Sequence, residues 1–175
     1  MANIRKLQEK KCNNFQDFCN AFLGLVTAST KAATRIDLVF DSYIEKSFKD
    51  SERQRRERKS PVELHEVSGE TPLPREMDRF WPSSDNKVKL ESLIHKEALE
   101  RKWTSPSVEI VVSRFCGPGD SIPCSSKKQE VTSRFPELEV SLEEADMRCI
   151  PHMMHAVNQG NKRIDCQLIQ MSSSC

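Results

Sequence analysis

The sequence predicts an α/β fold that is predominantly helical, with a few short strands and long irregular segments. A β-branched and aromatic run, Ile36 to Phe40, is typical of a buried strand. Apolar and polar residues alternate over 107–113, which indicates a half-buried strand. Residues 86–102 have helical spacing instead, with an apolar face opposite Lys and Glu side chains. That apolar face consists of Leu90, Leu93, Ile94 and Ala98.

The rest of the first 140 residues divides into helices and irregular stretches. Apolar residues recur at helical spacing within 4–26, so this segment is predicted to be a helix, and its apolar face consists of Phe15, Phe18, Cys19, Phe22, Leu25 and Val26. A polar helix is expected from about 42 to 59, and Pro61 ends it. Residues 60–85 contain several prolines without a clear period and are predicted to be loop. The polar stretch 120–136 is expected to be irregular.

Ser141 is expected to begin the last helix, because the residues 141–144 match a capping box. Gly160 is expected to end this helix as a C-terminal cap. Residues 164–169 are predicted to be a final strand, and 171–175 a disordered tail. The helical spacing predicts a buried stripe that consists of Ile150, Met153, Met154 and Val157.

Composition allows one modest hydrophobic core. Of the 175 residues, 37% are hydrophobic, below the roughly 45–50% of an ordinary globular chain. The net charge of +1 indicates no partner by itself. The chain has no secretory signal and no run of the ~18 apolar residues that a membrane span needs. A nuclear or cytoplasmic protein without a membrane partner is therefore expected.

The cysteine pattern favours free thiols. Seven cysteines are present, and no Cys-x-x-Cys pair occurs among them. Zinc ribbons and zinc fingers need such close ligand pairs, and disulfide scaffolds are shorter chains with denser cysteines. The cysteines are Cys12, Cys19, Cys116, Cys124, Cys149, Cys166 and Cys175.

Two groups of acidic residues are candidate metal ligands. Asp41 stands at the carboxyl end of an apolar strand, where ligands gather in open α/β sheets. Glu143, Glu144 and Asp146 cluster at the start of the last helix, where the helix dipole favours acidic groups. Carboxylates brought together in this way hold Mg²⁺ or Mn²⁺ for phosphoryl transfer. Mg²⁺ or Mn²⁺ is thus the cofactor expected if the site is functional.

A basic run begins just after Asp41. Residues 46–59 hold seven basic residues against three acidic ones, and such a cationic helix would lie beside a bound phosphate. DNA or RNA is therefore the expected partner. The candidate phosphate-binding residues are Lys49, Arg53, Arg55 and Arg56.

The two acidic groups and the basic run resemble segments of flap endonucleases and related structure-specific nucleases. In those proteins a strand ends in Val-Phe-Asp, the Asp binds metal, and the following helix provides Lys and Arg to the scissile phosphate. Val39-Phe40-Asp41 followed by Lys49 and Arg53 fits that pattern. Residues 143–146, Glu-Glu-Ala-Asp, are similar to the acidic helix start that provides further metal ligands.

The chain is more similar still to a group of transposon-associated animal proteins with such a domain. They carry Val-Phe-Asp-x-Tyr, then Ser-Ile-Lys and Glu-Arg, and later Glu-Glu-Ala-Asp-Thr-Arg with His and Ala. The matching segments here are 35–60 and 140–162, and the second includes Arg148, His152 and Ala156. The Asn-Lys pair at 86–87 resembles a recurring start of a middle helix. The implied fold is an incomplete PIN-like domain.

The departures from this pattern imply a degenerate site. The related proteins complete the metal site with an Asp-x-Asp element at a later strand, whereas Asp165 is a lone acid here. Pro151 falls inside the last helix, where proline deletes a backbone hydrogen bond. The expected organisation is a helical segment over 1–34 and a partial nuclease-like domain over 35–170. A loop-rich insert would occupy about 60–140.

Simpler interpretations remain open for each motif. Asp41 fits the N-cap of a following helix, and the acids at 143–146 fit an ordinary helix start. The basic run fits a solvated helix face or a nuclear import signal. Three function hypotheses follow. They are a degenerate nuclease-like remnant that binds nucleic acid, a protein-interaction module using helix 86–102, and a nuclease completed by another subunit.

Overall fold

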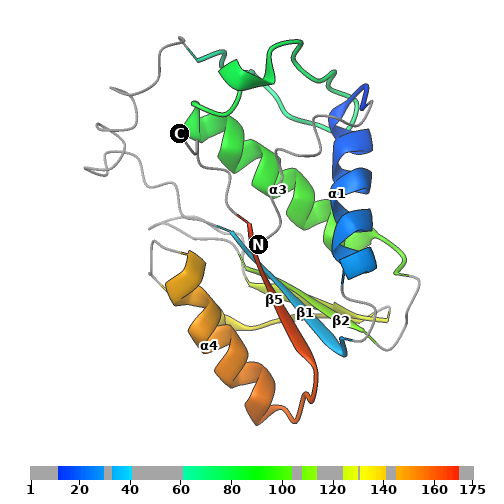
Figure 1. The fold of residues 1–175 in the computed structure, drawn as a ribbon, viewed down its shortest axis with the longest axis vertical. Helices are drawn as coiled ribbons and strands as arrows, with labels where there is room; N and C mark the ends of the chain where they lie inside the picture. Colours follow the sequence, from blue (N-terminus) through cyan, green and yellow to red (C-terminus); the bar gives the residue numbers. More distant parts are fainter. Residues whose placement is uncertain are drawn as a thin grey trace.

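The computed structural model describes residues 12–29, 33–40, 61–103, 108–113, 124–129, 131–140 and 145–169. These residues form a mixed α/β fold with a five-stranded sheet and three α-helices. The helices α1 (Phe15–Ser29) and α3 (Ser84–Glu100) lie on one face of the sheet, and α4 (Ala145–Asn158) lies on the other (Figure 1). The predicted fold class is confirmed at the level of a mixed α/β architecture.

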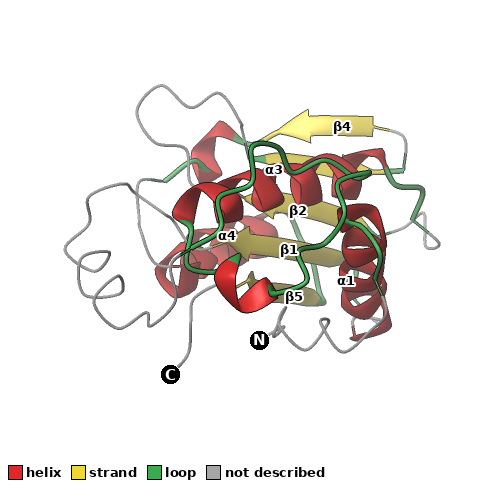
Figure 2. Ribbon diagram, turned by 90° about the horizontal axis from the view of Figure 1, so that it is seen from above, coloured by secondary structure: helices red, strands yellow, loops and turns green. Residues whose placement is uncertain are grey.

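The sheet is parallel at its centre and antiparallel at one side. Strand β1 (Arg35–Phe40) pairs in parallel with both β2 (Glu109–Ser113) and β5 (Ile164–Ile169). Strands β3 (Ser125–Lys128) and β4 (Val131–Arg134) continue the sheet in antiparallel fashion beyond β2. The order is β4-β3-β2-β1-β5, so β4 and β5 form the two edges among the described strands (Figure 2).

Strands β3 and β4 correct the expectation of an irregular segment over 120–136. Their side chains are mostly polar and lack an apolar alternation, so periodicity gave no strand signal. Backbone pairing to β2 and a tight turn, with Gln129 at φ 57°, hold them in the sheet. Tertiary pairing has here overridden weak local preference, as is common for strands.

The main hydrophobic core lies between the sheet and the pair α1 and α3. Side chains of a strand alternate between faces. Ile36, Leu38 and Phe40 of β1 therefore all enter this core, as do Ile110 and Val112 of β2. The predicted apolar faces of α3 and of the N-terminal helix are confirmed, with one exchange in α1. Leu23 is buried there, and Leu25 is 43% exposed.

Asn86 ties the predicted loop segment to the start of α3. Its Oδ1 accepts from the Leu64 amide at 2.9 Å, and its Nδ2 donates to the Val62 and Phe80 carbonyls at 2.7 and 3.1 Å. The Ser83 hydroxyl caps the helix by accepting from the Asn86 amide at 3.2 Å. Residues 61–83 are loop apart from a single 3₁₀ turn, Met77–Arg79.

Helix α4 is polar on its sheet side and apolar on its outer side. The predicted buried stripe is wrong, because its four residues Ile150, Met153, Met154 and Val157 are each 51–62% exposed. Arg148, His152 and Ala156 face the sheet instead and are at most 1% exposed. The cause is the sheet itself, since the side chains that β1 turns toward α4 include an arginine and an aspartate.

The ends and the interior of α4 follow local rules. Gly160, at φ 77°, ends the helix as predicted, with the Gly160 and Asn161 amides donating to carbonyls at 157 and 156. The helix continues through Pro151. The proline leaves the carbonyl of Met147 without its helical donor, but Met147 lies on the outer side, 49% exposed, where water can reach it. Among the described residues, no helix has the length and apolar character needed to cross a bilayer.

Candidate functional site

The carboxyl ends of β1, β2 and β5 lie at one edge of the sheet, because the three strands are parallel. Arg148, in the first turn of α4, holds this edge together. Its Nη1 donates to the Phe40 carbonyl at 2.6 Å, and its Nη2 donates to the Ser113 hydroxyl at 2.9 Å. Phe40 and Ser113 are the last residues of β1 and β2. The start of α4 therefore lies at the carboxyl ends of the two strands.

Most predicted metal ligands lie outside the described residues. Asp41, Glu143 and Glu144 belong to this group. Their described neighbours are Phe40, at the end of β1, and Ala145, at the start of α4, and the structure brings these two ends to one edge of the sheet.

Asp146 is the one predicted ligand that the structure places. It is exposed in the first turn of α4, and its Oδ1 accepts from the Met147 amide at 2.8 Å. That bond satisfies an amide at the helix start, as the simpler interpretation of this acid requires. The other carboxylate oxygen remains available to a ligand at the surface.

A complete metal site is not formed by the part of the chain that the structure describes. No group of three or more His, Cys, Asp or Glu side chains there could hold a metal ion. Mg²⁺ is held by carboxylate oxygens, and Asp146 is the one predicted carboxylate ligand that lies within the described residues. The predicted phosphate-binding residues Lys49, Arg53, Arg55 and Arg56 all lie outside the described residues.

A buried charge network beneath the edge was not predicted from the sequence. Arg35 and Asp37 form a bidentate ion pair, with Nε to Oδ1 at 2.7 Å and Nη2 to Oδ2 at 2.8 Å. Both side chains are 0% exposed. Asp37 Oδ2 also accepts from His152 Nδ1 at 2.7 Å, and this histidine is 0% exposed as well. Asp37 therefore joins β1 to α4.

His155 extends the network toward solvent. Arg35 Nη1 donates to its Nδ1 at 2.9 Å, so its Nε2 carries the proton that faces Glu137 Oε1 at 3.0 Å. The Phe135 ring lies against both side chains, 4.7 Å from the imidazole centroid and 5.7 Å from the Arg35 guanidinium carbon. Along α4, then, Arg148 meets the end of β1, His152 its middle and His155 its start.

The electrostatics of this network favour a charged pair. Burial alone would lower the pKa of Arg35, but the hydrogen bonds and negative charge of Asp37, with a contribution from Glu109, raise it. Arg35 therefore stays protonated. A buried ion pair of this geometry becomes costly when either partner is removed, since the other charge is left in a medium of low dielectric constant.

The Asp37–His152 pair has a structural role, because it links β1 to α4. A carboxylate on one ring nitrogen orients a histidine for proton transfer when the other nitrogen reaches a substrate. Here Nε2 of His152 is buried and has no hydrogen-bond partner among the described residues. A substrate cannot reach an imidazole that is fully enclosed, so the pair fixes α4 on the sheet.

This arrangement explains the second half of the resemblance motif. Arg148, His152 and Ala156 are spaced four residues apart and therefore share one helix face. All three lie against the sheet. That spacing, and the two opposite charges at Arg35 and Asp37 on one side of a strand, were the signals from which the network could have been found.

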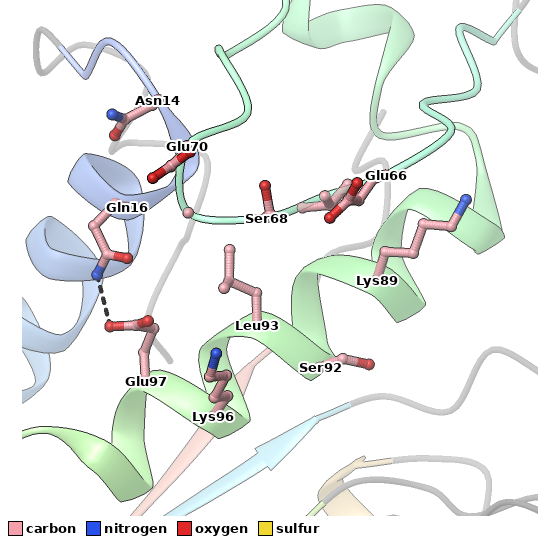
Figure 3. Close-up of a pocket in the computed structure, with 12 residues that line it drawn as sticks. Asn14, Gln16, Glu66, Ser68, Glu70, Lys89, Ser92, Leu93, Lys96 and Glu97 are labelled. Carbon is pink, nitrogen blue, oxygen red and sulfur yellow. Dashed lines mark hydrogen bonds between the residues drawn. The ribbon is translucent and has the colours of Figure 1, made fainter.

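A separate groove lies on the opposite side of the sheet. Figure 3 shows it between the start of α1, segment 66–70 and α3, and its volume is about 800 Å³. Gln16 Nε2 donates to Glu97 Oε2 at 2.6 Å within it. Both signs of charge line the groove, so it selects neither anions nor cations. The charged side chains are Glu66, Glu70, Lys89, Lys96 and Glu97.

Comparison of the chain with protein-family models, with curated proteins and with solved structures found no match.

Proposed function

We propose that the chain is a nuclease-like domain, of PIN-like type and transposon origin, that binds nucleic acid without cleaving it. The observation that carries the proposal is the contact of Arg148 with the Phe40 carbonyl. Through that contact the residue before Asp41 lies beside the helix turn that holds Asp146. In the sequence, Asp41 and the lysine- and arginine-rich run at 46–59 follow Phe40, and Glu143 and Glu144 come just before α4.

The lack of catalysis follows from the position of the remaining acids. Cleavage with two metal ions needs several carboxylates around the same pair of cations. Asp165 is paired in register with Ile36, near the amino end of the strands. It is four residues before Ile169, or about 13 Å from the carboxyl edge at roughly 3.3 Å per residue. Its Oδ1 is engaged by Gln167 Nε2 at 2.8 Å.

Salt-dependent binding tests the nucleic-acid part of the proposal. Fluorescence anisotropy with labelled single-stranded and hairpin DNA should show binding that weakens linearly in log Kd against log salt. Charge reversal of Arg53, Arg55 and Arg56 to Glu should reduce both affinity and salt slope. The matched control reverses Lys128, Lys162 and Arg163, which are exposed elsewhere, and should keep the slope. Equal losses in both variants would refute specific use of the basic run.

Cleavage assays test the catalytic part. Flap and hairpin DNA incubated with the purified protein and Mg²⁺ or Mn²⁺ should stay intact. Metal-dependent cleavage that Asp41→Asn abolishes would overturn the proposal. Calorimetric titration with Mn²⁺ adds a second readout, because a site completed by another subunit would bind metal strongly only in that subunit's presence.

A protein-interaction module is the second candidate function, and the outer side of α4 favours it. The α4 apolar face, defined as Met147, Ile150, Met153, Met154 and Val157, is 49–62% exposed at each position. Contiguous exposed apolar side chains mark protein contacts. The helix 86–102, named earlier as the interaction feature, has its own apolar face in the core.

The partner that fits this surface is a protein chain that extends the sheet. Helix α4 lies over the sheet that ends in β5, an edge strand among the described strands, so one partner can pair with β5 and also reach the outer side of α4. Ile150→Lys with Met154→Lys should abolish such a complex in cross-linking and sedimentation experiments. Gln159→Lys, at an exposed polar position of the same segment, is the control. A complex that survives the double variant would exclude the α4 apolar face.

A further inference from the structure

Two cysteines meet across the interface between α4 and the sheet. Cys149 of α4 packs against Val39, and Cys166 of β5 packs against the same small cluster. Cys166 is in register with Asp37, whose carboxylate faces α4, so the Cys166 thiol points to the same side. Both residues are thiols and belong to the same packed cluster with Val39.

The environments of the two sulfur atoms differ. The hydrogen bond from Cys166 lowers the pKa of Cys149 against the effect of burial, and Arg148 adds to this lowering. Asp37 and Asp146 act in the opposite direction. The same hydrogen bond and burial raise the pKa of Cys166, and Asp37 and Asp165 add to this rise. Cys149 is therefore the better nucleophile, with Cys166 as its donor.

We propose that Cys149 and Cys166 form a reversible, peroxide-driven disulfide that joins α4 to β5. The Cys149 thiolate attacks one oxygen of hydrogen peroxide, the O–O bond breaks, and a sulfenic acid and hydroxide form. The sulfur of Cys166, having lost its proton to that hydroxide, then displaces the sulfenic oxygen. The sulfenic oxygen leaves as hydroxide when the S–S bond forms, and it becomes the second water by taking up the proton that Cys149 released on ionisation. Two thiols are oxidised and one peroxide is reduced to two waters.

The placement of the other described thiols distinguishes this pair. Cys19 is 0% exposed within the main core, and Cys124 is 0% exposed in a different cluster with Val111 and Leu138. Cys149 is 8% exposed, and Cys166 is half-buried at the sheet edge. A small oxidant approaches the pair from the side of β5, where no described strand covers the sheet.

The test is oxidation of the folded full chain with micromolar hydrogen peroxide, followed by alkylation and peptide mapping. The expected product is a Cys149–Cys166 cross-linked peptide with the mass loss of two hydrogen atoms. Dithiothreitol should reverse the cross-link. The melting temperature should rise on oxidation and return on reduction, because the bond constrains the unfolded chain.

Two variants define the order of the steps. Cys166→Ser should stop the reaction at Cys149 sulfenic acid, which dimedone traps, and Cys149→Ser should give no dimedone adduct at position 166. Cys12→Ser serves as the control and should leave the cross-link unchanged. Circular dichroism before oxidation identifies any variant that fails to fold. Recovery of both cysteines as thiols from oxidised, folded protein would overturn the proposal, as would cross-linking of Cys149 to a different cysteine.

Discussion

Arg148 Nη1 donates a 2.6 Å hydrogen bond to the carbonyl oxygen of Phe40. The guanidinium is 1% exposed, and through it the first turn of α4 is fixed to the last residue of the central strand. A charged donor on a buried carbonyl is a strong contact. This side chain therefore links the start of α4 to the end of β1.

Replacement of Arg148 by Met should destabilise the protein. The substitution keeps most of the side-chain volume but leaves the Phe40 carbonyl and the Ser113 hydroxyl without their donor. The expected loss is about 2–4 kcal/mol of unfolding free energy, from two buried hydrogen bonds to a charged group. Urea unfolding followed by circular dichroism measures it. Arg163→Met, at an exposed arginine, should change stability by no more than about 0.5 kcal/mol.

Asp37→Asn should lower the free energy of unfolding by more than its small change in shape suggests. The asparagine leaves the Arg35 guanidinium buried without the carboxylate that pairs with it directly, and removal of one partner of such a pair costs about 3–5 kcal/mol. Asp78→Asn, at an exposed aspartate, is the matched control. Adding Arg35→Met to Asp37→Asn should recover part of the loss, because no unpaired charge remains. A double variant less stable than the single one would argue against the ion pair.

The two sides of α4 should respond in opposite ways to substitution. Met154→Lys, at a position 62% exposed, should alter the unfolding free energy by less than about 0.5 kcal/mol. Ala156→Leu, at 0% exposure against the sheet, should cost about 1–3 kcal/mol through overpacking. The unfolding free energies of the two variants, measured by chemical denaturation, show which side of α4 faces the sheet. If the stripe expected from periodicity faced the sheet instead, Met154→Lys would be the more destabilising of the two substitutions.

Alkaline pH should destabilise the fold through two buried thiols. Burial, helped by Glu97, raises the pKa of Cys19 from 9.0 to about 12. Burial, helped by Asp37, raises the pKa of Cys124 to about 12 as well. A raised folded-state pKa contributes stability that is complete below pH 9 and is lost as pH rises toward 12. The denaturation midpoint should fall as the pH is raised from 8 to 11. The fall should be less steep in a double variant that carries Cys19→Ala and Cys124→Ala.

Local patterns predicted the elements that bury apolar side chains in the main core. In the main core, the apolar side chains of each pattern pack against another apolar surface. This holds for the run at 36–40, the alternation at 109–113 and the helical spacing of α3. Two regions did not follow this rule. Strand β3 depends on pairing with β2 and β4 on pairing with β3, and the burial of α4 depends on charges contributed by β1. Apolar periodicity within one segment identifies neither partner; for α4 the available signals were the charges on β1 and the spacing of Arg148, His152 and Ala156.

The candidate site was predictable only in its outline. The sequence indicated that acids at the end of one strand and the start of one helix belong together. The contact that brings those ends together is made by Arg148, which periodicity alone does not distinguish from a surface arginine. Of the predicted ligands, Asp146 alone can be located, and it caps its own helix.

The segregation of charge on β1 has a consequence for folding. Arg35 and Asp37 occupy one side of the strand, while Ile36, Leu38 and Phe40 occupy the other. A slip by a single residue would drive both charged groups among the phenylalanines and expose three large apolar side chains to the histidines. Such a mispaired chain would be much less stable than the native one. The distribution of charge on this short strand therefore favours the correct register.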